Sequence, residues 1–267
     1  EYAIDNFLAG YKVDPKWIAI LTSLVQTYDA LDDRENAQKF LEEALITNPS
    51  AGIAHEMKIR WDFEDSMNTK EAKTSIENAK NNTDIGSIMD IVIQIYIFDK
   101  DYEIPIKLLS NINRDILSHQ SFLNAKDYYI GLMYDLMGND ELAVSFYRSA
   151  VVILERRLNE NIGDAMLHAA ISRVYVQLGL FEEAVKSAQL AVALVPPSRD
   201  AWYGMVNKTN LAFIYVSAEL MDDALHTLNE VYNKPFGPTK TQLLLYWEWE
   251  KLRMNSRFKT IINNTGN

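Results

Sequence analysis

Histidines and carboxylates are the side chains in this sequence that could do chemistry, and their spacing predicts no catalytic centre. The four histidines are His55, His119, His168 and His226, and no two of them lie within four residues of each other. A metal site on a single helix needs two histidines four residues apart, so the pair His55-Glu56 does not resemble a zinc-protease helix. We therefore expect each histidine to lie on the surface or in ordinary packing.

Adjacent carboxylates are frequent, but they recur at related places along the chain. General acid–base catalysis needs carboxylates that converge in a pocket, whereas paired acids in the first turn of a helix are stabilised by the helix dipole. The sequence also has no cysteine, no glycine-rich phosphate loop and no Gly-x-Ser-x-Gly elbow. We predict no catalytic residue, no metal and no cofactor, and an enzyme with a dispersed site is the least favoured alternative. The pairs are Asp32/Asp33, Glu42/Glu43, Glu182/Glu183 and Asp222/Asp223.

The composition is that of a helical, folded chain. Of the 267 residues 48% are hydrophobic, while only 10 are Gly and 7 are Pro, which is too few for the tight turns of an all-β protein. The formal charge of −11 argues against a nucleic-acid partner, because phosphate binding needs an excess of cations. The longest apolar stretches, such as residues 91–98, are too short to span a membrane.

One spacing repeats six times and organises the whole sequence. An aromatic residue is followed nine positions later by a small residue, and the distance from one aromatic to the next is 35, 33, 38, 41 and 40 residues. Apolar residues flank each pair at spacings of three and four, which indicates two helices per unit. The six pairs are Tyr28/Ala37, Phe63/Ala72, Tyr96/Pro105, Tyr134/Ala143, Tyr175/Ala184 and Tyr215/Ala224.

The small position has a physical reason. Two antiparallel helices approach to about 8–10 Å only where a small side chain lets their backbones close. Gly138 and Gly179 lie between the two helices of their units, where a positive φ is favourable for glycine. Pro105 departs from the small-residue pattern, and we expect it in the first turn of its helix. The sequence therefore predicts a series of antiparallel helical hairpins.

This pattern resembles the tetratricopeptide repeat (TPR), most closely in residues 21–49 and 168–196. The resemblance implies an all-α, right-handed superhelix of antiparallel hairpins, a TPR solenoid, forming one array over residues 1–267. Residues 1–15 would be the trailing helix of a truncated repeat, 18–238 six hairpins, and 239–267 a capping helix and tail. The register places Ala3 34 residues before Ala37, so we expect the sequence to begin in mid-repeat.

The last part of the chain resembles the segment that follows C-terminal TPR regions in bacterial signalling proteins. The resemblance covers about residues 146–262, and Lys251 and Ser256 replace two prolines of the usual pattern. In such proteins the array follows an adenylate or guanylate cyclase, a Ser/Thr kinase or a winged-helix regulator. The matching residues are Trp249, Glu250, Leu252, Arg253, Arg257 and Phe258.

The resemblance also implies a function for the inner face of the array. In TPR proteins the first helix of each repeat lines a concave groove, and the corresponding positions here include aromatic, Met and Arg side chains, which are enriched at binding hot spots. The predicted groove residues are Met57, Trp61, Phe98, Tyr128, Leu132, Arg173 and Phe213. The alternative is that Trp61, Phe98 and Tyr128 only pack against neighbouring helices.

We accordingly predict a non-catalytic protein–protein interaction module, the C-terminal regulatory or scaffolding part of a larger bacterial signalling protein. Its partner would be a protein or peptide, with no direct nucleic-acid binding and no membrane insertion of this fragment. The alternative is a self-association module that pairs an upstream cyclase, kinase or DNA-binding domain. The sequence fixes neither the partner nor the side of a membrane on which the chain lies.

Overall fold

The structure is a computed structural model that describes residues 2–119 and 122–263. The chain divides into two compact units, Glu1–Ile95 and Tyr96–Asn267, and each is described by itself. The boundary falls inside helix α6 (Met89–Phe98), so the last turn of that helix belongs to the second unit.

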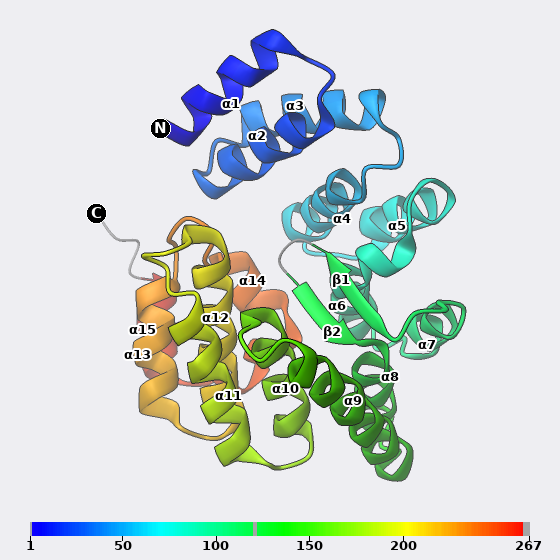
Figure 1. The fold of residues 1–267 in the computed structure, drawn as a ribbon, viewed down its shortest axis with the longest axis vertical. Helices are drawn as coiled ribbons and strands as arrows, with labels where there is room; N and C mark the ends of the chain where they lie inside the picture. Colours follow the sequence, from blue (N-terminus) through cyan, green and yellow to red (C-terminus); the bar gives the residue numbers. More distant parts are fainter. Residues whose placement is uncertain (1, 120–121, 264–267) are drawn as a thin grey trace. The chain divides into compact units, whose positions relative to one another are not determined.

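The first unit contains a leading helix and two hairpins. Helix α1 packs against α2, and the pairs α2/α3 and α4/α5 are antiparallel hairpins (Figure 1). The elements are α1 (Tyr2–Val13), α2 (Ile18–Ala30), α3 (Arg34–Thr47), α4 (Gly52–Ser66), α5 (Lys70–Asn82) and the short 3₁₀ helix η1 (Ile85–Ser87).

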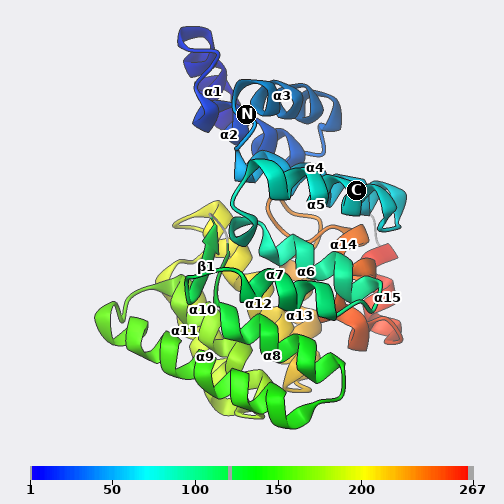
Figure 2. The same cartoon turned by 90° about the vertical axis from the view of Figure 1, so that its right-hand side faces the viewer.

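The second unit contains three hairpins in series, α8/α9, α10/α11 and α12/α13. The second helix of each hairpin packs against the first helix of the next, which is the stacking expected of a helical repeat (Figure 2). The helices are α7 (Glu103–Ser110), α8 (Lys126–Leu136), α9 (Asp140–Glu160), α10 (Ala165–Gln177), α11 (Phe181–Leu194), α12 (Ala201–Ser217) and α13 (Met221–Val231).

The predicted small positions are all buried. Ala143, Ala184 and Ala224 are at most 1% exposed, and Pro105 is buried in the first turn of α7, where a proline is tolerated. The prediction that small side chains allow the paired helices to approach is confirmed.

The turn between the two helices has the same backbone conformation in every copy. The residue four positions after each aromatic has a positive φ between 51° and 74°, and in most copies the next amide donates to the carbonyl of the aromatic. This is the Schellman ending of a helix, for which glycine is the favoured residue. The residues with positive φ in these six turns are Asp32, Met67, Lys100, Gly138, Gly179 and Glu219.

Replacing Gly179 by Ala is expected to lower the free energy of unfolding by about 1 kcal/mol, since φ is 72° and only the left-handed backbone penalises the new methyl group. Gly163→Ala is the matched control, because a Cβ there also meets open space but φ is not positive. Urea unfolding of both variants checks the prediction, and equal losses of stability would contradict it.

One element was not predicted. Strands β1 (Ile116–His119) and β2 (Phe122–Ala125) form a small antiparallel hairpin that pairs Leu117 with Asn124, and β2 packs against α10. The described residues are otherwise helical where regular, so the all-α prediction holds apart from this hairpin.

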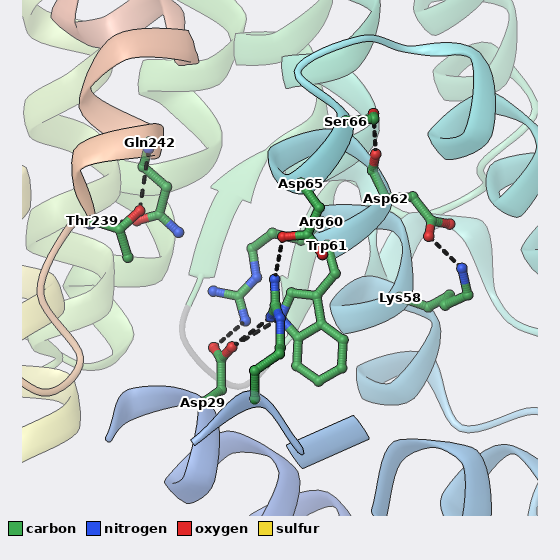
Figure 3. Close-up of polar contacts among 10 residues, drawn as sticks. Asp29, Lys58, Arg60, Trp61, Asp62, Asp65, Ser66, Thr239 and Gln242 are labelled. Atoms are coloured by element: carbon green, nitrogen blue, oxygen red, sulfur yellow. Dashed lines mark hydrogen bonds and ion pairs between the residues drawn. The ribbon is translucent and has the colours of Figure 1, made fainter. Parts of the chain in front are cut away.

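The C-terminal segment packs against the last hairpin of the second unit. Helix α14 (Lys240–Leu245) begins with a capping box between Thr239 and Gln242 (Figure 3), and is followed by the 3₁₀ helix η2 (Trp247–Leu252) and helix α15 (Ser256–Asn263). Trp249, Leu252 and Phe258 are at most 4% exposed and join the core of the last hairpin. The tail after residue 263 lies outside the described residues.

Candidate functional site: the inner strip of α10 and α12

In the first unit the predicted residue Trp61 is part of a polar clasp between helices. Its indole nitrogen donates to Oδ1 of Asp29 on α2 at 2.8 Å, and Arg60 donates to the other oxygen of Asp29 at 3.0 Å (Figure 3). Arg34 pairs with Asp29 and lies 4.0 Å from the centre of the Trp61 ring. Trp61 is 6% exposed and Met57 is 2% exposed, so these side chains join α4 to α2.

In the second unit three more of the predicted residues are covered. Tyr128 is fully buried, and Leu132 and Phe213 are at most 3% exposed. Five of the seven predicted groove residues are thus buried, namely Met57, Trp61, Tyr128, Leu132 and Phe213. Among the seven, Phe98 is 43% exposed and the Arg173 side chain is 25% exposed.

Arg173 is the centre of the polar contacts on the inner face of the second unit. Its Nε donates to Oδ1 of Asn210 on α12 at 2.7 Å, and its Nη1 donates to Oε1 of Glu248 at 3.2 Å. Its guanidinium also lies 4.9 Å from the centre of the Phe213 ring. The Arg173 guanidinium of α10 is thus held by two residues of α12 and one residue of η2.

The C-terminal segment supplies the covering side chains. Glu248 is 8% exposed although it is 75 residues from Arg173 in sequence, and the neighbouring Trp247 ring packs edge-on against Phe213 at 5.5 Å. An aromatic ring and a carboxylate from one short segment therefore occupy the end of the inner face. Neither Asn210 nor Glu248 was predicted, because both act through this long-range contact.

Burial sets the ionisation of the nearby Tyr128. Desolvation raises the pKa of its hydroxyl to about 12, and the positive charge of Arg173 opposes that rise. Within the described residues the hydroxyl has no hydrogen-bond partner of normal geometry. Tyr128 is therefore a neutral packing group at physiological pH.

Other side chains cover only part of the surface that α10 and α12 form beyond Arg173. The cap residue Asp164 accepts from the amides of Met166 and Leu167 and fixes the start of α10, so Met166, Ala169 and Arg173 follow one another on one face. On α12, which packs against α10, Val206 and Thr209 lie four residues and one residue before Asn210, the partner of Arg173, and the hydroxyl of Thr209 is buried. All five are half-buried, and we call Met166, Ala169, Arg173, Val206 and Thr209 the inner strip.

The two best-formed hollows of the described residues are shallow and lie away from the strip. One of about 370 Å³ is lined by α13 and α15, and one of about 530 Å³ lies over the first turns of α9. In residues 2–119 and 122–263 no group of three or more histidines and carboxylates could hold a metal ion. His55 and His168 instead bond the carbonyls of Pro49 and Ile162, at 2.7 and 2.8 Å.

A family comparison supports the interpretation of the repeat. Residues 18–50 match the tetratricopeptide repeat family. The matched tetratricopeptide repeat comprises α2, α3 and the residues up to Ser50, and the same buried small residue and turn φ recur in the later copies. No curated protein matches the chain.

A structural comparison finds the crystal structure of YrrB, described as a TPR protein with an unusual peptide-binding site. The match has 14% sequence identity, covers 85% of this chain and 91% of that chain, and has a TM-score of 0.28, which is too low to inform the arrangement of this chain. No described helix is both long and apolar enough to cross a membrane.

Proposed function

We propose that this chain is a non-catalytic protein–protein interaction module that binds an extended segment of a partner protein along the inner strip. The observation that carries the proposal is the seating of Trp247 and Glu248 against Phe213 and Arg173. The chain thus holds an aromatic and acidic segment of its own at one end of the strip. Tetratricopeptide repeats commonly serve protein binding, and the strip offers an apolar floor with one fixed cation.

The residues predicted from the sequence take two roles in this proposal. Arg173 and Phe98 retain exposed surface that a partner could contact. Met57, Trp61, Tyr128, Leu132 and Phe213 would act by holding the helices in place. The placement of this module in a larger bacterial signalling protein, after a cyclase, kinase or winged-helix domain, rests on the resemblance of residues 146–262 alone.

Self-association is the second candidate function. Val152 and Ile162 are 67% and 79% exposed, and apolar side chains of this size are candidates for a contact between copies. Sedimentation of the chain at high micromolar concentration distinguishes the two: a monomer removes the second candidate.

Selection of peptides from a random library, followed by fluorescence anisotropy, tests the first proposal. Thr209→Trp should weaken binding of the selected peptides at least tenfold by filling the strip, and Met166→Glu should do the same by charging its floor. Gln189→Trp on the exposed side of α11 is the matched control and should leave Kd unchanged. Equal affinities for all the folded variants would contradict the proposal, as would a library that yields no binder.

A further inference from the structure

A second surface of the second unit is defined by the turns that join the two helices of its hairpins. These turns lie at the same end of the stack, along the lower edge of the unit in Figure 1. We define the turn edge as residues 135–142, 177–183 and 217–223. Its exposed large apolar side chains, 38–47% exposed, are Leu136, Met137, Leu142, Leu180, Phe181 and Leu220.

The charged residues of the turn edge all have one sign. The three segments contain eight Asp and Glu residues and no Lys, Arg or His, and all eight acids are exposed. Arg257 of α15 pairs with Asp222, so one acid of the edge is neutralised from outside it. The acids are Asp135, Asp140, Glu141, Glu182, Glu183, Glu219, Asp222 and Asp223.

The fold accounts for some of the acids but not for the apolar residues. Glu182 and Glu183 complement the dipole at the start of α11, as the corresponding pairs do in α9 and α13. Nothing in helix capping requires Leu180 and Phe181 to precede them on the surface, since polar residues are the usual choice at a helix start. An apolar ridge that recurs in three successive turns is a surface suited to a partner.

The pattern is confined to these three turns. The equivalent turns nearer the N-terminus contain Arg34, Lys70 and Lys100, and Arg34 pairs with Asp29 and Asp65. A ridge that is apolar and purely acidic is therefore not imposed by the repeat.

We propose that the turn edge docks a cationic amphipathic helix of a partner protein, with its apolar face on the ridge and its Lys or Arg residues on the acids. Charge selects this occupant. A second copy would bring another set of acids against these eight, and the whole chain carries −11, so like charges oppose self-docking. An anionic lipid surface is disfavoured for the same reason, whereas a basic helix gains from both the charges and the apolar ridge.

Three synthetic 18-residue peptides test the proposal by fluorescence anisotropy with the full chain. One is an amphipathic helix of Leu and Lys, one replaces Lys by Glu, and one replaces Leu by Ser. Only the Leu/Lys peptide should bind tightly. Raising the salt concentration from 50 to 300 mM should lower its affinity severalfold. Equal binding of the Leu/Glu or of the Ser/Lys peptide would overturn the proposal, as would no binding of any of the three.

Variants locate the contact. The double variant Leu180→Ser, Phe181→Ser should lower the affinity for the Leu/Lys peptide at least tenfold. The double variant Glu182→Lys, Glu183→Lys should lower it by the same factor while every apolar residue is kept. Leu190→Ser, at a 39% exposed position of α11, is the matched control. Thr209→Trp should leave this binding unchanged, which separates the turn edge from the inner strip. Affinities unaffected by both double variants, or a dimer lost on Phe181→Ser, would overturn the proposal.

Discussion

Replacing Arg173 by Met is expected to lower the free energy of unfolding of the second unit by about 3 kcal/mol. The substitution keeps most of the side-chain volume but removes the guanidinium that pairs with the Glu248 carboxylate, which is 8% exposed. An uncompensated buried charge is among the most destabilising changes a single substitution makes. It also removes the donor to Asn210. Urea unfolding followed by tryptophan fluorescence measures the effect, with Trp247 beside the altered site.

The double variant Arg173→Met, Glu248→Leu provides the internal check. Replacing both partners by apolar groups also removes the buried Glu248 carboxylate, so most of the lost stability should return. Arg156→Met is the control, because Arg156 and Asp115 are both more than 60% exposed and 3.9 Å apart. A double variant as unstable as the Arg173→Met variant, or a single loss below about 1 kcal/mol, would mean that the inner-face contact does not form.

Replacing Phe258 by Ala is expected to lower the free energy of unfolding of the second unit by about 3–5 kcal/mol. The ring is fully buried in the core that also contains Ala224, Leu228 and Trp249, and its removal leaves a cavity under the C-terminal segment. Thermal unfolding monitored by circular dichroism measures the loss.

Met254→Ala is the matched control for this prediction. Met254 lies four residues away in the same segment but is 84% exposed, so its truncation should change stability by less than about 0.5 kcal/mol. Equal effects of the two substitutions would show that the segment does not pack as described.

The repeat could be predicted from the sequence because its structural requirements act within a single hairpin. Ala184 had to be small because α10 and α11 close on each other, and Gly179 marks a turn whose φ is 72°. Both requirements act within one hairpin, so they leave a regular spacing even where Glu219 replaces the glycine.

Long-range contacts could not be predicted in this way. Nothing near Arg173 indicates that Glu248 meets it, because that contact depends on how the C-terminal segment turns back over α12. Phe213 was predicted to line the concave groove, and in the structure the Trp247 ring packs on it. The β1/β2 hairpin was missed because each strand has only four residues.

Hydrogen–deuterium exchange with and without a library-selected peptide tests the central claim most directly. If the inner strip binds a partner segment, peptide binding should slow exchange in residues 165–177 and 201–213, where α10 and α12 lie, and the slowing should disappear in the Thr209→Trp variant. Slowed exchange confined to other helices, or to the turn edge, would contradict the assignment of the inner strip as the binding site.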